Sequence, residues 1–275
     1  MESSDYVPSS SSLTTKELQQ NLKLVKRRDR PIRLLFDIPS ARIVERALSK
    51  YVLYKVVVMR SGSFDNICLP VERRYSDFCR FHHKLQEEFS EELEDVLLPR
   101  KLLSGNFDPE NIVERRLGLR DYLAKLYATR CVRYSPRFPE FFTEQEQKRA
   151  HSFLRAGQFK SALDELQLIL GIQERMEPWQ SATLLVPTLC AMAVCYRDLE
   201  EPEQAFAAAH RVLPTLRRYK VDKYRTPVLE MLVDLGYQLG KPVAQLQDEL
   251  TKLRDGERGE VSYCSLKELV VQEFI

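Results

Sequence analysis

The residues Arg73-Arg74-Tyr75-Ser76-Asp77-Phe78 lie where an alternating apolar pattern changes into a helical one. Side chains alternate between the two faces of a strand, so we expect the two arginines to point in opposite directions. Ser76 and Asp77 are typical of a helix N-cap, and the start of a helix carries partial positive charge. A guanidinium, an aromatic ring and a helix start together favour a phosphorylated, ring-shaped ligand. A solvated strand end before a capped helix is the alternative.

Composition indicates a globular protein with room for two domains, since the chain has 275 residues and 44% of them are hydrophobic. Residues 1–142 hold 25 Lys and Arg against 20 Asp and Glu, whereas residues 143–275 hold 17 against 20. This asymmetry favours an anionic partner for the first half, although a solvated charged face would give the same balance. The six cysteines lack metal-ligand spacing. No apolar run reaches the ~20 residues of a membrane span, so we expect reduced thiols, no metal and only peripheral membrane contact.

The first half has the pattern of a small sheet followed by helices. Pro39 is expected to end the first strand, and Asp108-Pro109 to begin a helix with Asp108 as its N-cap. Pro136–Phe142 is expected to form an aromatic-rich turn that closes this half. Three strands should form an antiparallel meander: Ile32–Phe36, Lys50–Met59 and Ile67–Arg74.

The second half is helical in pattern throughout and repeats a helix–turn–helix motif three times. The turns fall around Gly157, Pro202 and Gly240, as in a tetratricopeptide (TPR) repeat. Small side chains should let the paired helices approach closely at Ala162, Ala205 and Ala244. We therefore expect three stacked helical hairpins with a surface for a protein partner. A plain helical bundle that only supports the first half is the alternative.

Several motifs, taken in order, resemble a known family. The meander, the stretch Arg73–Phe78, Leu98-Pro99-Arg100-Lys101 and Glu114-Arg115-Arg116-Leu117-Gly118-Leu119 resemble a phox-homology (PX) domain over residues 30–142. Residues 143–275 resemble the PX-associated B domain, and the pair is similar to the sorting nexins. The resemblance implies an α+β domain followed by an all-α, TPR-like domain. Composition predicts a disordered, basic segment before them at residues 1–29, which is Ser-rich at its start and basic toward its end.

The resemblance also implies a binding site for phosphatidylinositol 3-phosphate. Arg74 matches the arginine that binds the 3-phosphate, and Tyr75 matches the ring that stacks on the inositol. Ser76 occupies a further position that lines the headgroup. Lys101 matches the contact to the 1-phosphate, and Arg115 matches the arginine that holds the 4- and 5-hydroxyls.

A loop after this motif has two readings. Leu102, Leu103 and Phe107 match the family's membrane-inserting residues, whereas from the residues alone they could equally pack beneath the loop. The resemblance implies a cytoplasmic protein that is peripheral on the early endosome membrane, with the plasma membrane as an alternative. It also implies the sorting of transmembrane cargo, whose cytoplasmic tail would bind the helical domain.

Other classes of function are less favoured. The chain lacks a G-x-S-x-G motif, a Walker loop and a cluster of His with carboxylates, so we expect no catalysis and no cofactor. Its basic residues are interleaved with acidic ones, which argues against nucleic-acid binding. The remaining alternative is a protein-binding scaffold that prefers phosphatidylinositol 4,5-bisphosphate or binds no lipid.

Overall fold

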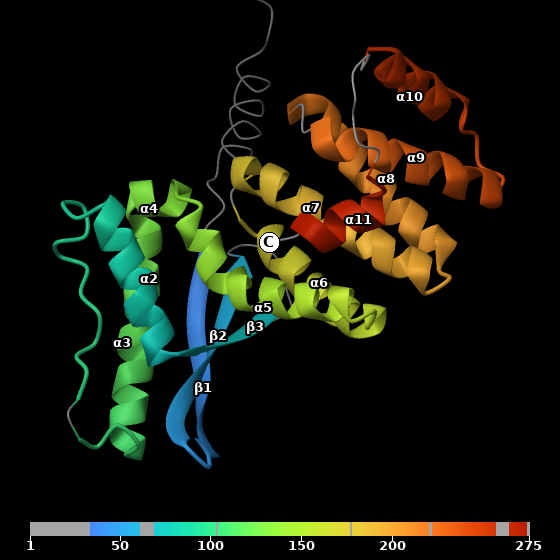
Figure 1. Cartoon of the computed structure of the whole chain (residues 1–275). Coiled ribbons are helices and arrows are strands. Elements are labelled where there is room, and N and C mark those ends of the chain that lie inside the picture. Colours follow the sequence, from blue (N-terminus) through green and yellow to red (C-terminus); the bar gives the residue numbers. More distant parts are fainter. Residues whose placement is uncertain are drawn as a thin grey trace, which may run out of the picture. The chain divides into compact units, whose positions relative to one another are not determined.

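Three strands form one antiparallel sheet in the order β1–β2–β3, which confirms the predicted meander (Figure 1). The computed structural model describes residues 34–60, 69–102, 104–176, 178–219, 222–256 and 264–273. The predicted N-terminal segment, residues 1–29, lies outside the described residues. The strands are β1 (Leu34–Arg46), β2 (Ser49–Arg60) and β3 (Leu69–Arg74).

Pro39 does not end the first strand, contrary to the prediction. β1 continues to Arg46, and its pairing with β2 shifts register between Asp37 and Ser40. Proline has no backbone N–H to donate to a neighbouring strand. At a bulge in an edge strand the residue is unpaired, so this hydrogen bond is not needed there. β1 is such an edge strand, so Pro39 lies at a shift in its pairing with β2 but does not end the strand.

The helix after β3 begins earlier than its predicted cap. α2 spans Tyr75–Glu88, and Arg74 is its N-cap. The carboxylate of Asp77 accepts a hydrogen bond of 2.8 Å from the backbone N–H of Arg74. Asp77 thus caps the helix from its third position, as in one half of a capping box. For the next helix, α3 (Pro109–Ala128), Asp108 is the N-cap as predicted.

A helix stands where an aromatic turn was expected. After the short helix α4 (Arg130–Tyr134), α5 spans Arg137–Arg155 without interruption. The Phe141 ring stacks on Phe81 of α2 with 4.4 Å between centroids, and Phe142 stacks on Phe36 of β1 at 5.6 Å. The aromatic spacing therefore belongs to a helix face that covers the sheet and α2.

The same helix continues into the second half of the chain. Ala150 and Leu154, near the end of α5, are buried in the core of the helical region. The predicted division between residues 142 and 143 therefore falls inside one continuous helix, and α5 contributes to both hydrophobic cores.

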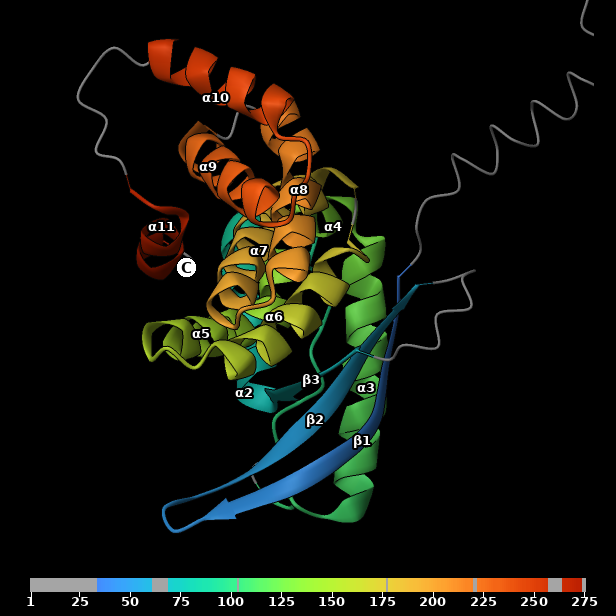
Figure 2. The ribbon, with the colours of Figure 1, turned by 90° about the vertical axis from the view of Figure 1, so that its right-hand side faces the viewer.

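Three helical hairpins follow, as predicted (Figure 2). In each, the residue at the turn has a positive φ: Gly157 at 70°, Glu200 at 60° and Gly240 at 64°. The next backbone N–H then bonds a carbonyl five residues back, which closes each first helix in the same way. The pairs are α5 with α6 (Phe159–Gln173), α7 (Pro178–Asp198) with α8 (Pro202–Tyr219), and α9 (Asp222–Gln238) with α10 (Ala244–Gly256). A last helix, α11, spans Leu266–Glu273.

The close approach of paired helices follows the prediction in two hairpins and not in the third. Ala162 and Ala205 are fully buried, whereas Ala244 is exposed. α10 begins four residues after Gly240, whereas α6 and α8 begin two residues after their turn residues, Gly157 and Glu200. The longer turn changes which residues of the two helices face each other. The small residue at the closest approach is therefore Gly236 of α9 and not Ala244. A Cβ there would lie 2.2 Å from Val243 Cγ1.

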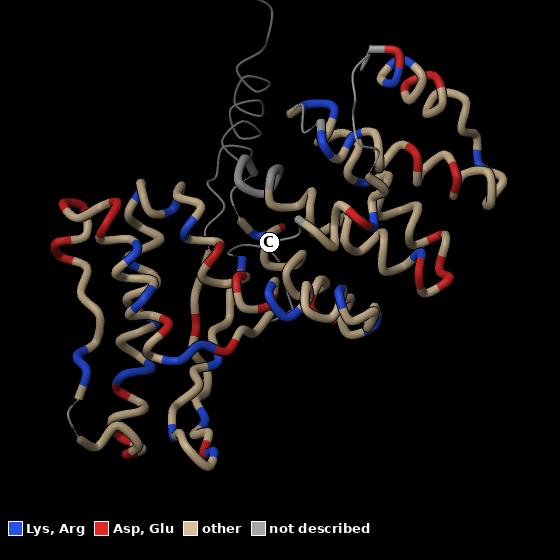
Figure 3. Tube along the Cα trace, in the orientation of Figure 1, with Lys and Arg blue, Asp and Glu red and all other residues tan. Residues whose placement is uncertain are grey.

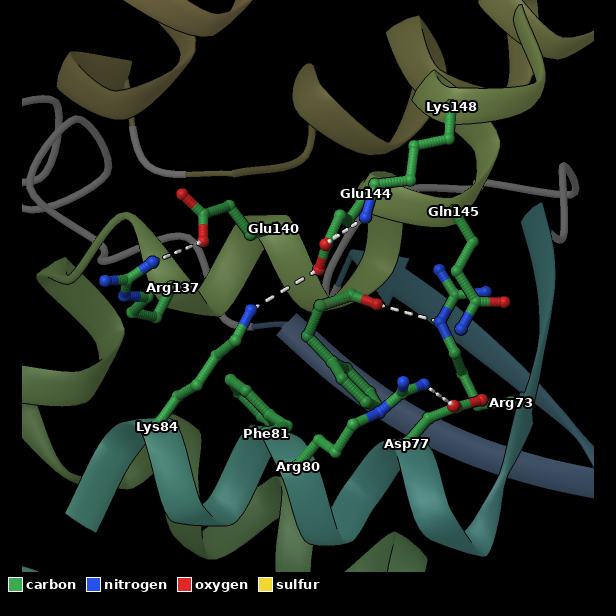
Figure 4. A pocket seen from close by; sticks show the side chains of 11 residues that line it. Arg73, Asp77, Arg80, Phe81, Lys84, Arg137, Glu140, Glu144, Gln145 and Lys148 are labelled. Carbon is green, nitrogen blue, oxygen red and sulfur yellow. Dashed lines mark hydrogen bonds and ion pairs between the residues drawn. The ribbon is translucent and has the colours of Figure 1, made fainter. Parts of the chain in front are cut away.

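An ion pair joins the end of β3 to α5. Arg73 and Glu146 are 1% and 2% exposed in their side chains, and the two nitrogen–oxygen distances are 2.8 and 2.6 Å. Arg73 Nε also donates to the Phe141 carbonyl at 2.8 Å (Figure 4). Arg74 is exposed, so the two arginines point in opposite directions, as predicted.

We expect Glu146→Ala to lower the free energy of unfolding by about 3–5 kcal/mol, because it leaves a buried guanidinium without its carboxylate. Urea unfolding followed by circular dichroism measures the loss. Arg42→Ala is the matched control, since it removes the exposed pair with Glu72 and should lower the free energy of unfolding far less. A loss no larger than that of the control would mean that the buried pair does not hold β3 to α5.

Candidate functional site

The site is centred where β3 passes into α2. The guanidinium carbon of Arg74 lies 3.5 Å from the ring centroid of Tyr51 on β2. Arg74 pairs with Leu53 across the sheet, so Tyr51 is its diagonal neighbour on the same face. This stacking restrains an exposed arginine at the start of a helix. Sequence reasoning missed Tyr51, since its place beside Arg74 depends on the strand register.

Tyr75 connects three segments of the chain. Its hydroxyl donates a hydrogen bond to the Pro99 carbonyl, and the Arg115 guanidinium carbon lies 4.8 Å from its ring centroid. Burial is the largest cause that raises the pKa of Tyr75 to about 12. The hydroxyl therefore remains a neutral donor at physiological pH, and it holds the loop before α3 against the start of α2.

Arg115 is the buried cation of the site, with 6% of its surface exposed. It stacks on Tyr75, and its Nη2 donates to Asn106 Oδ1 at 3.0 Å. The guanidinium also lies near Tyr54: burial raises the pKa of Tyr54, and Arg115 opposes that rise. A guanidinium has five N–H donors, so the bond to Asn106 does not exhaust it. Sequence reasoning missed both Tyr54 and Asn106.

The glycine of the Glu114–Leu119 motif has a packing role. A Cβ on Gly118 would lie 2.8 Å from Pro99 Cγ, so only glycine lets the loop approach α3 this closely. The loop and α3 together line a cavity of about 500 Å³, with Arg115, Leu98 and Leu102 in its lining. The loop of Pro99 is thereby held against the helix that carries Arg115.

The following loop is held by its own side chains. Asn106 Nδ2 donates to the Leu102 carbonyl at 2.9 Å, and Asn111 Nδ2 donates to the Gly105 carbonyl at 2.9 Å. Gly105 has φ 71°, and a Cβ there would lie 2.7 Å from Asp108 Oδ2. Since Asn106 also accepts from Arg115, this loop and the buried cation position each other.

The structure brings some of the five predicted headgroup residues together. Tyr75 and Arg115 are in contact, and Arg74 precedes Tyr75 in the chain. Lys101 is exposed two residues after Pro99, whose carbonyl is bonded to Tyr75. Ser76 is exposed in the first turn of α2. Figure 3 shows basic residues in all three segments: the end of β3, the loop before α3 and the first half of α3.

The predicted membrane-inserting residues are only partly exposed. Leu102 is half-buried, and Phe107 is 37% exposed with Lys50 Nζ 5.1 Å from its ring centroid. Leu103 lies outside the described residues. Lys50 belongs to the β1–β2 hairpin, whose turn carries Leu48 with its whole side chain exposed. Sequence reasoning missed Leu48, because a single leucine in a turn gives no pattern.

A second pocket lies between α2 and α5 and has a different character (Figure 4). Its volume is about 250 Å³. Each of its cations pairs with a neighbouring carboxylate: Arg80 with Asp77, Lys84 and Lys148 with Glu144, and Arg137 with Glu140. A carboxylate already competes for each of these cations, so this pocket is the weaker candidate for an anionic ligand.

Among the residues that the structure describes, no three His, Cys, Asp or Glu side chains are grouped so as to hold a metal ion. Within the same residues, no helix combines the length and apolar character that crossing a bilayer requires.

Comparison with known proteins identifies relatives along the whole chain. A family model for the PX domain matches residues 62–145, which contain all the predicted headgroup residues. Sorting nexin-20 of Rattus norvegicus is 47% identical and covers 100% of this chain and 87% of its own length. Sorting nexin-20 of Bos taurus is 46% identical, with 97% and 84% covered. Sorting nexin-21 of Mus musculus is 33% identical, with 97% and 73% covered. The chain therefore belongs to the sorting nexin family and carries a PX domain.

Proposed function

We propose that the chain binds phosphatidylinositol 3-phosphate at the β3–α2 site and sorts transmembrane cargo at endosomes. That it is a phosphoinositide-binding membrane adaptor follows from its family. The proposal adds three points: the headgroup carries a 3-phosphate, the membrane is that of the endosome, and the helical region binds the cytoplasmic tail of the cargo. The observation that carries it is the Arg115–Tyr75 stack beside an exposed, restrained Arg74.

In this proposal Arg74 binds the 3-phosphate. Its side chain is stacked on Tyr51 before any ligand arrives, so less conformational entropy is lost on binding. A guanidinium binds phosphate through paired, charge-assisted hydrogen bonds. The partial positive charge at the start of α2 adds to this attraction, and Ser76 lines the same end of the helix.

The other residues would fix the sugar ring. The Tyr75 ring forms the flat wall on which the inositol stacks, because Pro99 and Arg115 hold it from two sides. Arg115 donates to the 4- and 5-hydroxyls, and exposed Lys101 contacts the 1-phosphate. Three cations around one headgroup make the binding dependent on salt. No residue is assigned a catalytic role.

We further propose that the loop and the β1–β2 hairpin meet the bilayer together. Phe107 and Leu102 come from the loop, and Leu48 projects from the hairpin turn. The contact between Lys50 and Phe107 joins the two segments. Apolar side chains would enter the interfacial region, while Lys50 would attract anionic lipid.

The alternative headgroup, phosphatidylinositol 4,5-bisphosphate, needs further cations. Arg116 lies next to Arg115 and would be one such cation, but its Nη1 donates to the Pro39 carbonyl at 2.8 Å. This contact directs the side chain toward β1, so Arg116 is not counted among the three cations of the proposed site.

We expect Arg74→Ala to weaken binding to liposomes that contain phosphatidylinositol 3-phosphate by about 10- to 100-fold, because it removes charge-assisted bonds to the phosphate. The thermal unfolding curve should be nearly unchanged, since the Arg74 side chain is exposed. Co-sedimentation measures binding. Arg80→Ala, which removes an exposed arginine from α2, is the control for a general loss of positive charge. Binding equal to wild type by a folded Arg74→Ala would overturn the site.

We expect Phe107→Asp and Leu48→Asp each to weaken liposome binding by about fivefold or more, since a charge in the interfacial region opposes insertion. Binding of soluble inositol 1,3-bisphosphate should stay within about twofold of wild type. Fluorescence titration of both ligands makes the comparison. Equal losses for the liposome and the soluble headgroup would show that these residues support the site and do not enter the bilayer.

A further inference from the structure

One face of the helical hairpins is already covered by the chain itself. α11 packs against α5, α7 and α9, the first helix of each hairpin. Leu266, Leu269 and Val270 of α11 are buried there. At its end, His151 Nε2 donates to the Val271 carbonyl at 2.8 Å. A partner of the helical region would therefore bind most readily elsewhere, on the second helices.

A groove of about 560 Å³ lies on those second helices, between α8 and the start of α10. Buried Leu213 and Leu246 form an apolar floor, and Phe206 is half-buried beside them. His210, Arg217 and Lys241 add basic side chains. None of the nine lining residues is an Asp or Glu.

The groove has more positive than negative charge at its Arg217 end. Arg217 pairs with Glu249, but Glu249 also binds Arg225 at 2.8 Å, so two guanidiniums share one carboxylate. The hydrogen bond from Arg217 is the largest cause that lowers the pKa of Glu249, which therefore stays ionised. At the other end, Lys241 Nζ lies 4.3 Å above the Phe206 ring and pairs with Glu203 at the rim.

We propose that this groove binds a short peptide segment of a partner protein that carries carboxylates around a bulky apolar side chain. The apolar floor would take the bulky side chain, Arg217 and Lys241 would attract the carboxylates, and His210 would offer a ring N–H as a hydrogen-bond donor. A bilayer is the less favoured occupant, because the large aliphatic side chains form a buried floor and do not project outward. The inference rests on the proposed role of the helical region in binding a protein partner.

Ala244 offers a test that removes no existing interaction. It is the first residue of α10, it lines the groove and it is exposed. Ala244→Glu adds a carboxylate to the groove, and Ala244→Gln adds almost the same shape without the charge. Both substitutions suit the first turn of a helix, so both variants should fold, as circular dichroism can verify.

The probe is a random-peptide phage library panned against the full chain, and the selected peptides are then synthesised for fluorescence anisotropy. We expect acid-rich peptides with a central apolar residue. Ala244→Glu should weaken their binding about fivefold, and Ala244→Gln should leave it within about twofold. Peptides without acidic residues, or equal losses in the two variants, would overturn the proposal.

Vesicles separate this inference from the proposed lipid function. Binding to phosphatidylinositol 3-phosphate vesicles should be equal in wild type, Ala244→Glu and Ala244→Gln. Phosphatidylserine vesicles that bind wild type but not Ala244→Glu would overturn the proposal by assigning the groove to a membrane surface. Acid-rich peptides that bind both variants as well as wild type would place peptide binding elsewhere, leaving the adaptor function intact.

Discussion

The buried pair of Arg73 and Glu146 determines where the end of β3 stands. Moving a guanidinium and a carboxylate out of water is costly, and only a close geometry with further hydrogen bonds compensates for it. Here two nitrogen–oxygen contacts and the Phe141 carbonyl provide that geometry. Because side chains alternate along a strand, holding Arg73 on the inner face sends Arg74 to the outer one. The exposed cation of the candidate site thus depends on the buried one.

α5 extends this constraint from the sheet to the hairpins. Its first half places Phe141 and Phe142 among the aromatic rings of the sheet and α2, and its second half places Ala150 and Leu154 in the helical core. A helix is a continuous hydrogen-bonded unit, so the two halves cannot separate without breaking it. The lipid-binding and partner-binding roles that we propose therefore belong to regions joined by a shared helix and not by a flexible linker.

The candidate site combines one restrained, exposed arginine with one buried arginine. Arg74 rests on Tyr51, while Arg115 lies between Tyr75 and Asn106. Two glycines make this possible, in a chain with only nine. Gly118 lets Pro99 approach α3, and Gly105 gives the loop its left-handed turn. The site is thus preorganised mainly by aromatic rings and by loop side chains.

The sequence alone determined the meander, the three hairpins and the opposite directions of Arg73 and Arg74, because these follow from local periodicity and turn chemistry. It also singled out Tyr75 and Arg115, through motifs of a recognisable family. Only the tertiary structure decided the partners. The carboxylate that meets Arg73 is 73 residues away, and the ring beneath Arg74 depends on strand register. The local pattern also failed at the start of α5, where a turn was expected over Pro136–Phe142, because these aromatic residues are placed by packing on distant strands and helices.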